Sequence, residues 1–114
     1  MKTNISIRHI EYALALKKHG TFSAAAKACH VSQPALSEAI QKFESDLGSV
    51  IFDRSKNPIE ITDVGEVLLK QCEQVMLECQ NLFEMADTWN DQVRGVLKLG
   101  LIPTLAPSDR KSTR

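Results

Sequence analysis

The chain has 114 residues, which is enough for one small domain with an extension but too few for two independent hydrophobic cores. Its 14 Lys and Arg residues balance its 14 Asp and Glu residues, so the composition excludes a strongly basic protein that coats nucleic acid without sequence preference. No apolar run approaches the roughly 20 residues that cross a bilayer, and the N-terminus lacks a signal-peptide core, so we expect a soluble cytoplasmic protein.

A first helix is predicted over residues 6–19, and Gly20 follows where a helix would end. Its apolar side chains recur at helical spacing and predict one buried stripe. These side chains are Ile7, Ile10, Ala13, Leu14 and Leu16.

A second, short helix follows a hydroxyl-bearing cap, which is either Thr21 or Ser23. Its run of alanines at residues 24–26 presents small side chains, which allow close packing against a crossing helix. His30 and Val31 then form the turn that leads to the third helix.

The third helix is predicted over residues 32–47, with Ser32 as its N-cap and Gly48 at its end. Pro34 falls in the first turn, where its missing N–H costs nothing. The buried stripe of this helix is formed by Leu36, Ile40, Phe43 and Leu47. The three helices together form a helix-turn-helix unit.

Another face of the third helix carries small polar side chains, which lie together at about 100° per residue. They are Gln33, Pro34, Ser37, Glu38 and Gln41. Because Gln can bond bidentately to adenine, Ser can bond to several bases and free N–H groups at a helix start can take a phosphate, this face suits a groove of DNA. The alternative is an ordinary solvated face on a small helical bundle.

Two short β-type runs follow, at residues 50–52 and 59–61, separated by a polar segment with turn-forming residues. They predict a small hairpin, or wing. Arg54 and Lys56 at its tip would meet the phosphates or the minor groove beside the site that the third helix contacts. The alternative is that two basic residues in a turn are common on any soluble protein.

A long helix is predicted from the N-cap Thr62 to about residue 90, with a length of about 42 Å. Its apolar side chains fall at two heptad positions and form a continuous seam along the helix. Residues 1–62, here called the head, are too few to cover this seam completely. A second chain is therefore the expected partner. The predicted dimerisation residues are Leu68, Cys72, Val75, Cys79, Leu82, Ala86 and Trp89. The alternative, packing on the chain's own head, is expected only for the first two turns, where Gly65 allows close backbone approach.

Residues 96–102 have the pattern of a strand, and residues 103–114 are polar without a pattern. Because a single strand is not stable alone, it indicates the beginning of a further domain.

The sequence indicates no metal, cofactor or catalytic site. The three cysteines, Cys29, Cys72 and Cys79, are expected to be buried thiols of a reducing cytoplasm. The Cys29-His30 pair is too isolated for metal binding, and no nucleophile and base stand in a catalytic constellation.

Charge is distributed unevenly along the chain. The head holds 8 basic and 6 acidic side chains, residues 63–90 hold 1 and 6, and residues 91–114 hold 5 and 2. The head is therefore only mildly basic, which favours a protein that needs a dimer to bind DNA tightly.

These features, over roughly residues 5–106, resemble the N-terminal part of LysR-type transcriptional regulators. The matching runs include Gly20-Thr21-Phe22, His30-Val31-Ser32-Gln33-Pro34-Ala35-Leu36-Ser37, Ile51-Phe52-Asp53-Arg54 and Gly65-Glu66. Within that family, the runs Cys29-His30-Val31-Ser32-Gln33-Pro34 and Gly100-Leu101-Ile102-Pro103-Thr104 resemble the peroxide-sensing OxyR branch.

The resemblance implies a sequence-specific double-stranded DNA-binding protein, forming a homodimer or homotetramer through antiparallel linker helices. It implies that a small-molecule or redox effector would act only on an effector domain beyond this chain. It further implies contacts with bases or the groove for Gln33, Pro34 and Ser37, contacts with phosphate for Thr21, Ser23 and Ser32, and a wing contact for Arg54. Glu38 and Gln41 stand where many relatives have arginine or another basic residue.

We therefore expect a mainly α fold, a winged helix-turn-helix with three helices and a small β-hairpin wing, followed by a long linker helix for dimerisation. The expected parts are a DNA-binding domain at 1–62, the linker helix at 63–92, and the truncated start of an effector domain with a tail outside the family pattern at 93–114. Alternatives are the winged-helix head of another regulator, such as the molybdate-responsive type, and a helical protein-interaction module. An enzyme is not expected.

Overall fold

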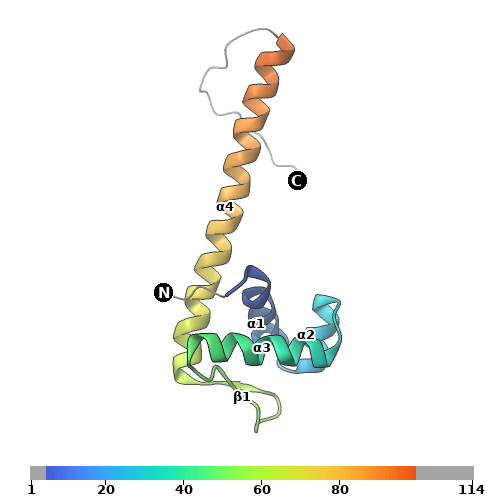
Figure 1. Ribbon diagram of the computed structural model, residues 1–114, viewed down its shortest axis with the longest axis vertical. Coiled ribbons are helices and arrows are strands. Elements are labelled where there is room, and N and C mark those ends of the chain that lie inside the picture. Colours follow the sequence, from blue (N-terminus) through green and yellow to red (C-terminus); the bar gives the residue numbers. More distant parts are fainter. Residues whose placement is uncertain (1–4, 100–114) are drawn as a thin grey trace. The chain divides into compact units, whose positions relative to one another are not determined.

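The computed structural model describes the backbone of residues 5–99 and the side chains of residues 5–92. The elements are α1 (Ile7–His19), α2 (Phe22–Cys29), α3 (Gln33–Leu47), β1 (Phe52–Asp53), β2 (Glu60–Ile61) and α4 (Asp63–Leu99). Figure 1 shows α1, α2 and α3 grouped with β1 in the blue to green part of the chain. The chain divides into two compact units, Met1–Met76 and Leu77–Arg114, so that α4 belongs to the first unit up to Met76.

Local hydrogen bonds begin and end the first three helices. Ser6, Thr21 and Ser32 are N-caps, and each side chain accepts a hydrogen bond from the backbone N–H three residues later, at 3.1 to 3.2 Å. Gly20 and Gly48 end α1 and α3 in the left-handed conformation, with φ of 82° and 71°. The structure thus confirms the predicted bounds of the first and third helices and selects Thr21 as the cap of the second.

The turn between α2 and α3 lies at His30 and Val31, as predicted. His30 adopts a left-handed conformation with φ 61°. Its N–H donates to the Lys27 carbonyl at 3.2 Å, and the Val31 N–H donates to the Ala26 carbonyl at 3.0 Å. This pair of bonds is a Schellman motif, which satisfies the carbonyls at the end of α2 and turns the chain towards α3.

The core of the first unit is formed by one side of each of its helices and by the chain that leads into β1. Ala13 and Ala25 are completely buried, which agrees with the predicted close packing of small side chains. The remaining core residues are Ile10, Leu16, Ala26, Leu36, Ile40, Phe43, Ile51, Phe52, Leu69 and Cys72.

The wing is shorter than predicted, because β1 and β2 contain two residues each. They pair antiparallel with Phe52 opposite Ile61. At one end, the Ile51 carbonyl accepts from the Thr62 N–H at 2.9 Å, in register with the Phe52–Ile61 pair, and so continues the pairing of the two strands. At the other end, the Ile59 N–H donates to the Gly20 carbonyl at 3.0 Å, so a tertiary bond replaces the strand pairing there.

The helix α4 extends beyond the predicted end near residue 90 and continues to Leu99. The prediction of a strand at residues 96–102 is therefore wrong for 96–99, while 100–102 and the predicted tail lie outside the described residues. A helix satisfies its backbone bonds internally, whereas a strand there would need a partner strand. In the described part of the chain, no helix is long and apolar enough to cross a membrane.

The first part of α4 covers the core of its own unit further than predicted. Leu69 and Cys72 are buried, and Val75 and Met76 pack against the core. The contact therefore lasts for about four turns instead of two. Lys17 of α1 adds an ion pair with Glu73 at 3.1 Å.

Gly65 is the point of closest approach in this contact. A Cβ at this position would lie 2.5 Å from the Ile51 carbonyl oxygen and 2.9 Å from a methyl group of Ile51 and of Ile61. Real Cβ atoms do not come so near to a backbone oxygen, so only glycine fits. This confirms the close backbone approach that the sequence predicted.

We expect Gly65→Ala to lower the free energy of unfolding by about 1 to 3 kcal/mol, because the added methyl group forces α4 away from the Ile51 carbonyl. Chemical denaturation followed by circular dichroism measures this change. The control is Gln74→Ala at an exposed site on α4, which should change stability by less than about 0.5 kcal/mol. Equal stability of the Gly65 variant and the wild type would contradict the packing argument.

Candidate nucleic-acid interface

The helix α3 has one buried side and one side open to solvent. Leu36, Ile40 and Phe43 are at most 1% exposed, which fixes the rotation of the helix about its axis. The polar face defined from the sequence is accessible along its length, although Ser37 is half-buried. Its exposed members are Gln33, Pro34, Glu38 and Gln41.

The predicted phosphate contacts lie at the starts of α2 and α3. The hydroxyl oxygens of Thr21 and Ser32 already accept the capping bonds described above, but each hydroxyl keeps its proton for donation to a phosphate oxygen. Ser23 is exposed in the first turn of α2. These hydroxyls and the helix starts suit an anion, because backbone N–H groups there are not used within the helix.

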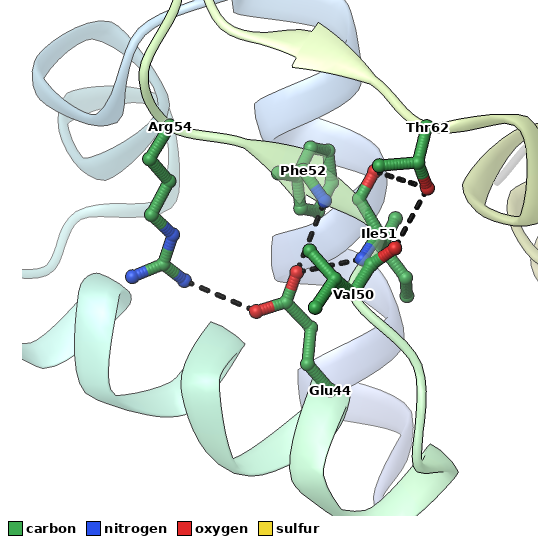
Figure 2. A network of polar contacts seen from close by, with 6 residues as sticks. All are labelled: Glu44, Val50, Ile51, Phe52, Arg54 and Thr62. Carbon is green, nitrogen blue, oxygen red and sulfur yellow. Dashed lines mark hydrogen bonds and ion pairs between the residues drawn. The ribbon is translucent and has the colours of Figure 1, made fainter.

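Glu44 connects α3 to the wing (Figure 2). One carboxylate oxygen, Oε2, accepts hydrogen bonds from the Ile51 N–H at 2.8 Å and the Phe52 N–H at 3.0 Å. The other, Oε1, pairs with Arg54 at 3.4 Å. The Glu44 side chain is only 12% exposed, so these bonds are shielded from water. Sequence reasoning missed Glu44; its position beside the apolar stripe was the one available signal that it is partly buried.

Two contacts hold the Arg54 side chain in place, in contrast to the free side chain that is expected at the tip of a hairpin. Its side chain is 30% exposed, and its guanidinium carbon lies 4.9 Å from the centre of the Phe22 ring. The contact with Phe22 and the pair with Glu44 hold Arg54 between α2 and α3. The sequence predicted that both Arg54 and Lys56 lie at the tip of the wing. Lys56, unlike Arg54, is exposed in the turn.

A second polar contact fixes the start of α4 beside the wing. The Thr62 hydroxyl donates to the Val50 carbonyl at 2.7 Å (Figure 2). It also accepts from the Gly65 N–H at 2.9 Å, which confirms its predicted capping role.

Between α3 and β1 lies an open hollow of about 510 Å³. Its polar lining consists of the acidic residues Glu44 and Asp53, the basic residue Arg54, and Gln41 and Thr62. Hydrogen bonds from the Ser55 hydroxyl and then from its N–H lower the pKa of Asp53. The hollow therefore carries both acidic and basic side chains, and Arg54 is paired with Glu44 within its lining.

The three cysteines are free thiols, and they differ in burial. Only Cys72 is buried, whereas Cys29 and Cys79 are half-buried, so the expectation of three buried thiols is wrong for two of them. Burial, and secondarily the carboxylate of Glu73, raises the pKa of Cys72, while burial and Glu11 raise that of Cys29. Both therefore favour the unreactive thiol. Among residues 5–92, no group of three or more His, Cys, Asp or Glu side chains could hold a metal ion.

The predicted dimerisation residues divide between the two units. In the first unit, Cys72 belongs to the core, and Leu68 and Val75 pack against it, so this part of the seam is covered by the chain itself. In the second unit, Leu82 and Trp89 are 64% and 65% exposed, Ala86 is exposed and Cys79 is half-buried. Phe83 and Met85 are exposed beside them.

Residues 7–66 match the family described as "Bacterial regulatory helix-turn-helix protein, lysR family". The "DNA-binding transcriptional dual regulator OxyR" of Escherichia coli is 41% identical over 103 residues, which cover 90% of this chain and 34% of that protein. The chain thus spans about a third of the length of the curated relatives that it matches.

Two solved structures show the same fold. A full-length OxyR variant from Pseudomonas aeruginosa has a TM-score of 0.70 and 37% identity over 74% of this chain and 28% of that one. A crystal structure described as a BenM DBD/benA site 1 DNA complex has a TM-score of 0.71 and 25% identity, over 73% of this chain and 93% of that one. The winged helix-turn-helix predicted from the sequence is thereby confirmed.

We expect Glu44→Ala to lower the free energy of unfolding by about 1 to 3 kcal/mol, because two backbone N–H groups and Arg54 lose their acceptor. Glu44→Gln keeps one amide oxygen for the N–H groups and should lie between the alanine variant and the wild type. Denaturant titration measures both. Glu38→Ala, at an exposed position of the same helix, is the matched control and should remain within about 0.5 kcal/mol of the wild type. If Glu44→Ala is as stable as this control, the wing does not depend on Glu44.

Proposed function

Because the chain belongs to the LysR family of bacterial regulatory helix-turn-helix proteins and carries that family's DNA-binding domain, we propose that it regulates transcription by binding specific sequences of double-stranded DNA. The observation that carries this proposal is the accessible polar face of α3, opposite a completely buried stripe. A recognition helix needs this combination, because it must be held firmly from one side while base edges meet the other.

In this proposal, the polar face of α3 enters the major groove. Gln33 lies in the first turn, where its amide can make paired hydrogen bonds to adenine, and Pro34 and Ser37 lie beside it. The hydroxyls of Thr21, Ser23 and Ser32 bind phosphate oxygens and set the position of the domain on the duplex. Gln41 reaches a base or a phosphate further along the helix, and Arg54 and Lys56 contact the flanking backbone.

We further propose that two copies associate through α4. The support is the exposed apolar surface of the second unit, whose members Leu82, Ala86 and Trp89 recur at heptad spacing. Leu68, Cys72 and Val75 contribute less, since the chain's own core already covers them. A dimer would present two recognition helices about 34 Å apart, or a multiple of that distance, along one side of DNA.

We propose the predicted division into a DNA-binding part at 1–62 and a linker helix from residue 63, with that helix extended from the predicted end at 92 to Leu99, where α4 ends. We propose a cytoplasmic protein without catalytic activity, as befits a regulator that acts on the chromosome.

A second candidate function is a helical interaction module, which the exposed Phe83, Met85 and Trp89 favour. A gel shift with random-sequence DNA at low salt separates the two functions. A DNA-binding domain shifts the duplex, whereas an interaction module with no net charge does not.

We expect Gln33→Ala to weaken binding to a DNA site selected by the wild type by about 1 to 3 kcal/mol and to relax the choice of base at one position. Fluorescence anisotropy with the selected duplex measures the loss of affinity. Gln71→Ala, an exposed glutamine on α4, is the matched control and should bind as the wild type does. Unchanged affinity of the Gln33 variant would remove Gln33 from the base contacts.

We expect Leu82→Glu to weaken self-association at least about tenfold, because burying a leucine side chain contributes about 1.5 to 3 kcal/mol and burying an unpaired charge is costly. Sedimentation equilibrium measures the dissociation constant. Gln80→Glu adds the same charge about 160° around the helix from Leu82 and should leave association unchanged. Equal dissociation constants for the two variants would refute dimerisation through this seam.

A further inference from the structure

Three carboxylates lie on α3, and they differ in their partners. Glu44 pairs with Arg54 at 3.4 Å, and Asp46 pairs with Lys42 at 3.7 Å. Glu38 is exposed and makes no hydrogen bond or ion pair with any other residue whose side chain the structure describes. Lys42 stands one helical turn after Glu38, where a stabilising pair would form, but it is engaged with Asp46 instead.

Glu38 also occupies the centre of the side of α3 that is open to solvent. At about 100° per residue it lies about 200° around the helix from the fully buried Leu36, and Gln41 follows it by three residues on the same side. Any duplex that approaches this face therefore meets an uncompensated negative charge. Phosphates repel that charge, so a DNA site that binds tightly must offer it a hydrogen-bond donor.

The major groove offers such donors on two bases only. Guanine presents the acceptors O6 and N7, and thymine presents the acceptor O4 and a methyl group, so both repel or fail to bond an ionised carboxylate. Adenine presents its N6 amino group beside the acceptor N7. Cytosine presents its N4 amino group with no acceptor of its own in that groove, which makes it the best match for glutamate.

We infer that Glu38 is a specificity-determining residue that selects cytosine, through the N4 amino group, at one position in each half of the DNA site. The inference rests on the proposed function and adds to it the nucleobase that is selected and the hydrogen bond that selects it. The carboxylate contributes to sequence specificity mainly by weakening the binding of every DNA site that lacks the amino group at this position.

Selection of bound duplexes from a random-sequence pool tests the inference. The wild type should enrich cytosine at one position of each half-site, and Glu38→Ala should lose that preference and keep all the others. Glu38→Ala should also bind random-sequence DNA more tightly, since it removes a repelling charge. Glu11→Ala removes the same charge from an exposed site on α1 and is the matched control, with the base preferences of the wild type.

A second measurement examines the contact itself. In the selected duplex, the cytosine is replaced by pyrimidin-2-one, which lacks the amino group. The wild type should lose roughly 5- to 150-fold in affinity, and Glu38→Ala should lose clearly less, so that the two changes are coupled in a double-mutant cycle.

The outcomes distinguish the inference from the function on which it rests. If the wild type enriches no sequence at all, the proposed DNA recognition fails and the role of Glu38 fails with it. If the wild type enriches a site but Glu38→Ala enriches the same one, only the inference is overturned. Enrichment of adenine instead of cytosine, or equal losses on pyrimidin-2-one for both proteins, overturns it as well.

Discussion

The functional surface depends on the burial of Leu36, Ile40 and Phe43. These side chains are completely or almost completely removed from water, and each contributes roughly 1.5 to 3 kcal/mol to folding. Because they lie on one side of α3, they allow only one rotation of that helix against α1 and α2. The same rotation decides which side chains of α3 are open to solvent, so the core and the face that we propose for DNA recognition follow from one constraint.

Glu44 extends this constraint from the helix to the wing. Its carboxylate holds the backbone at Ile51 and Phe52, and it pairs with Arg54, whose guanidinium also stacks over Phe22. A charge-assisted bond in a shielded place is stronger than one in water, so a single side chain can orient a hairpin with only two residues in each strand. The wing is therefore positioned by tertiary bonds more than by its own ladder.

The two parts of α4 differ in what covers their apolar side chains. Up to Met76 its apolar residues complete the core of the first unit, and Gly65 permits the close approach that this needs. Between Leu77 and Trp89, large apolar side chains remain exposed. A heptad pattern describes both parts equally well, because spacing along a helix states which residues share a side but not what covers them.

The sequence by itself determined the bounds of α1 and α3, the turn at His30, the need for a glycine at position 65 and the polar face of α3. The helix bounds, the turn and the polar face depend on bonds within a few residues or on the period of the helix, and both can be inferred from neighbouring positions. The residue type indicates that Gly65 permits a close approach, but only the structure identifies the Ile51 carbonyl as the group that it approaches. Only the tertiary structure decided the partners of Glu44, the stacking of Arg54 on Phe22 and the extent of α4 that the head covers. The contacts that decide these features join residues well separated along the chain, such as Arg54 and Phe22, and their distances depend on how all the intervening elements pack.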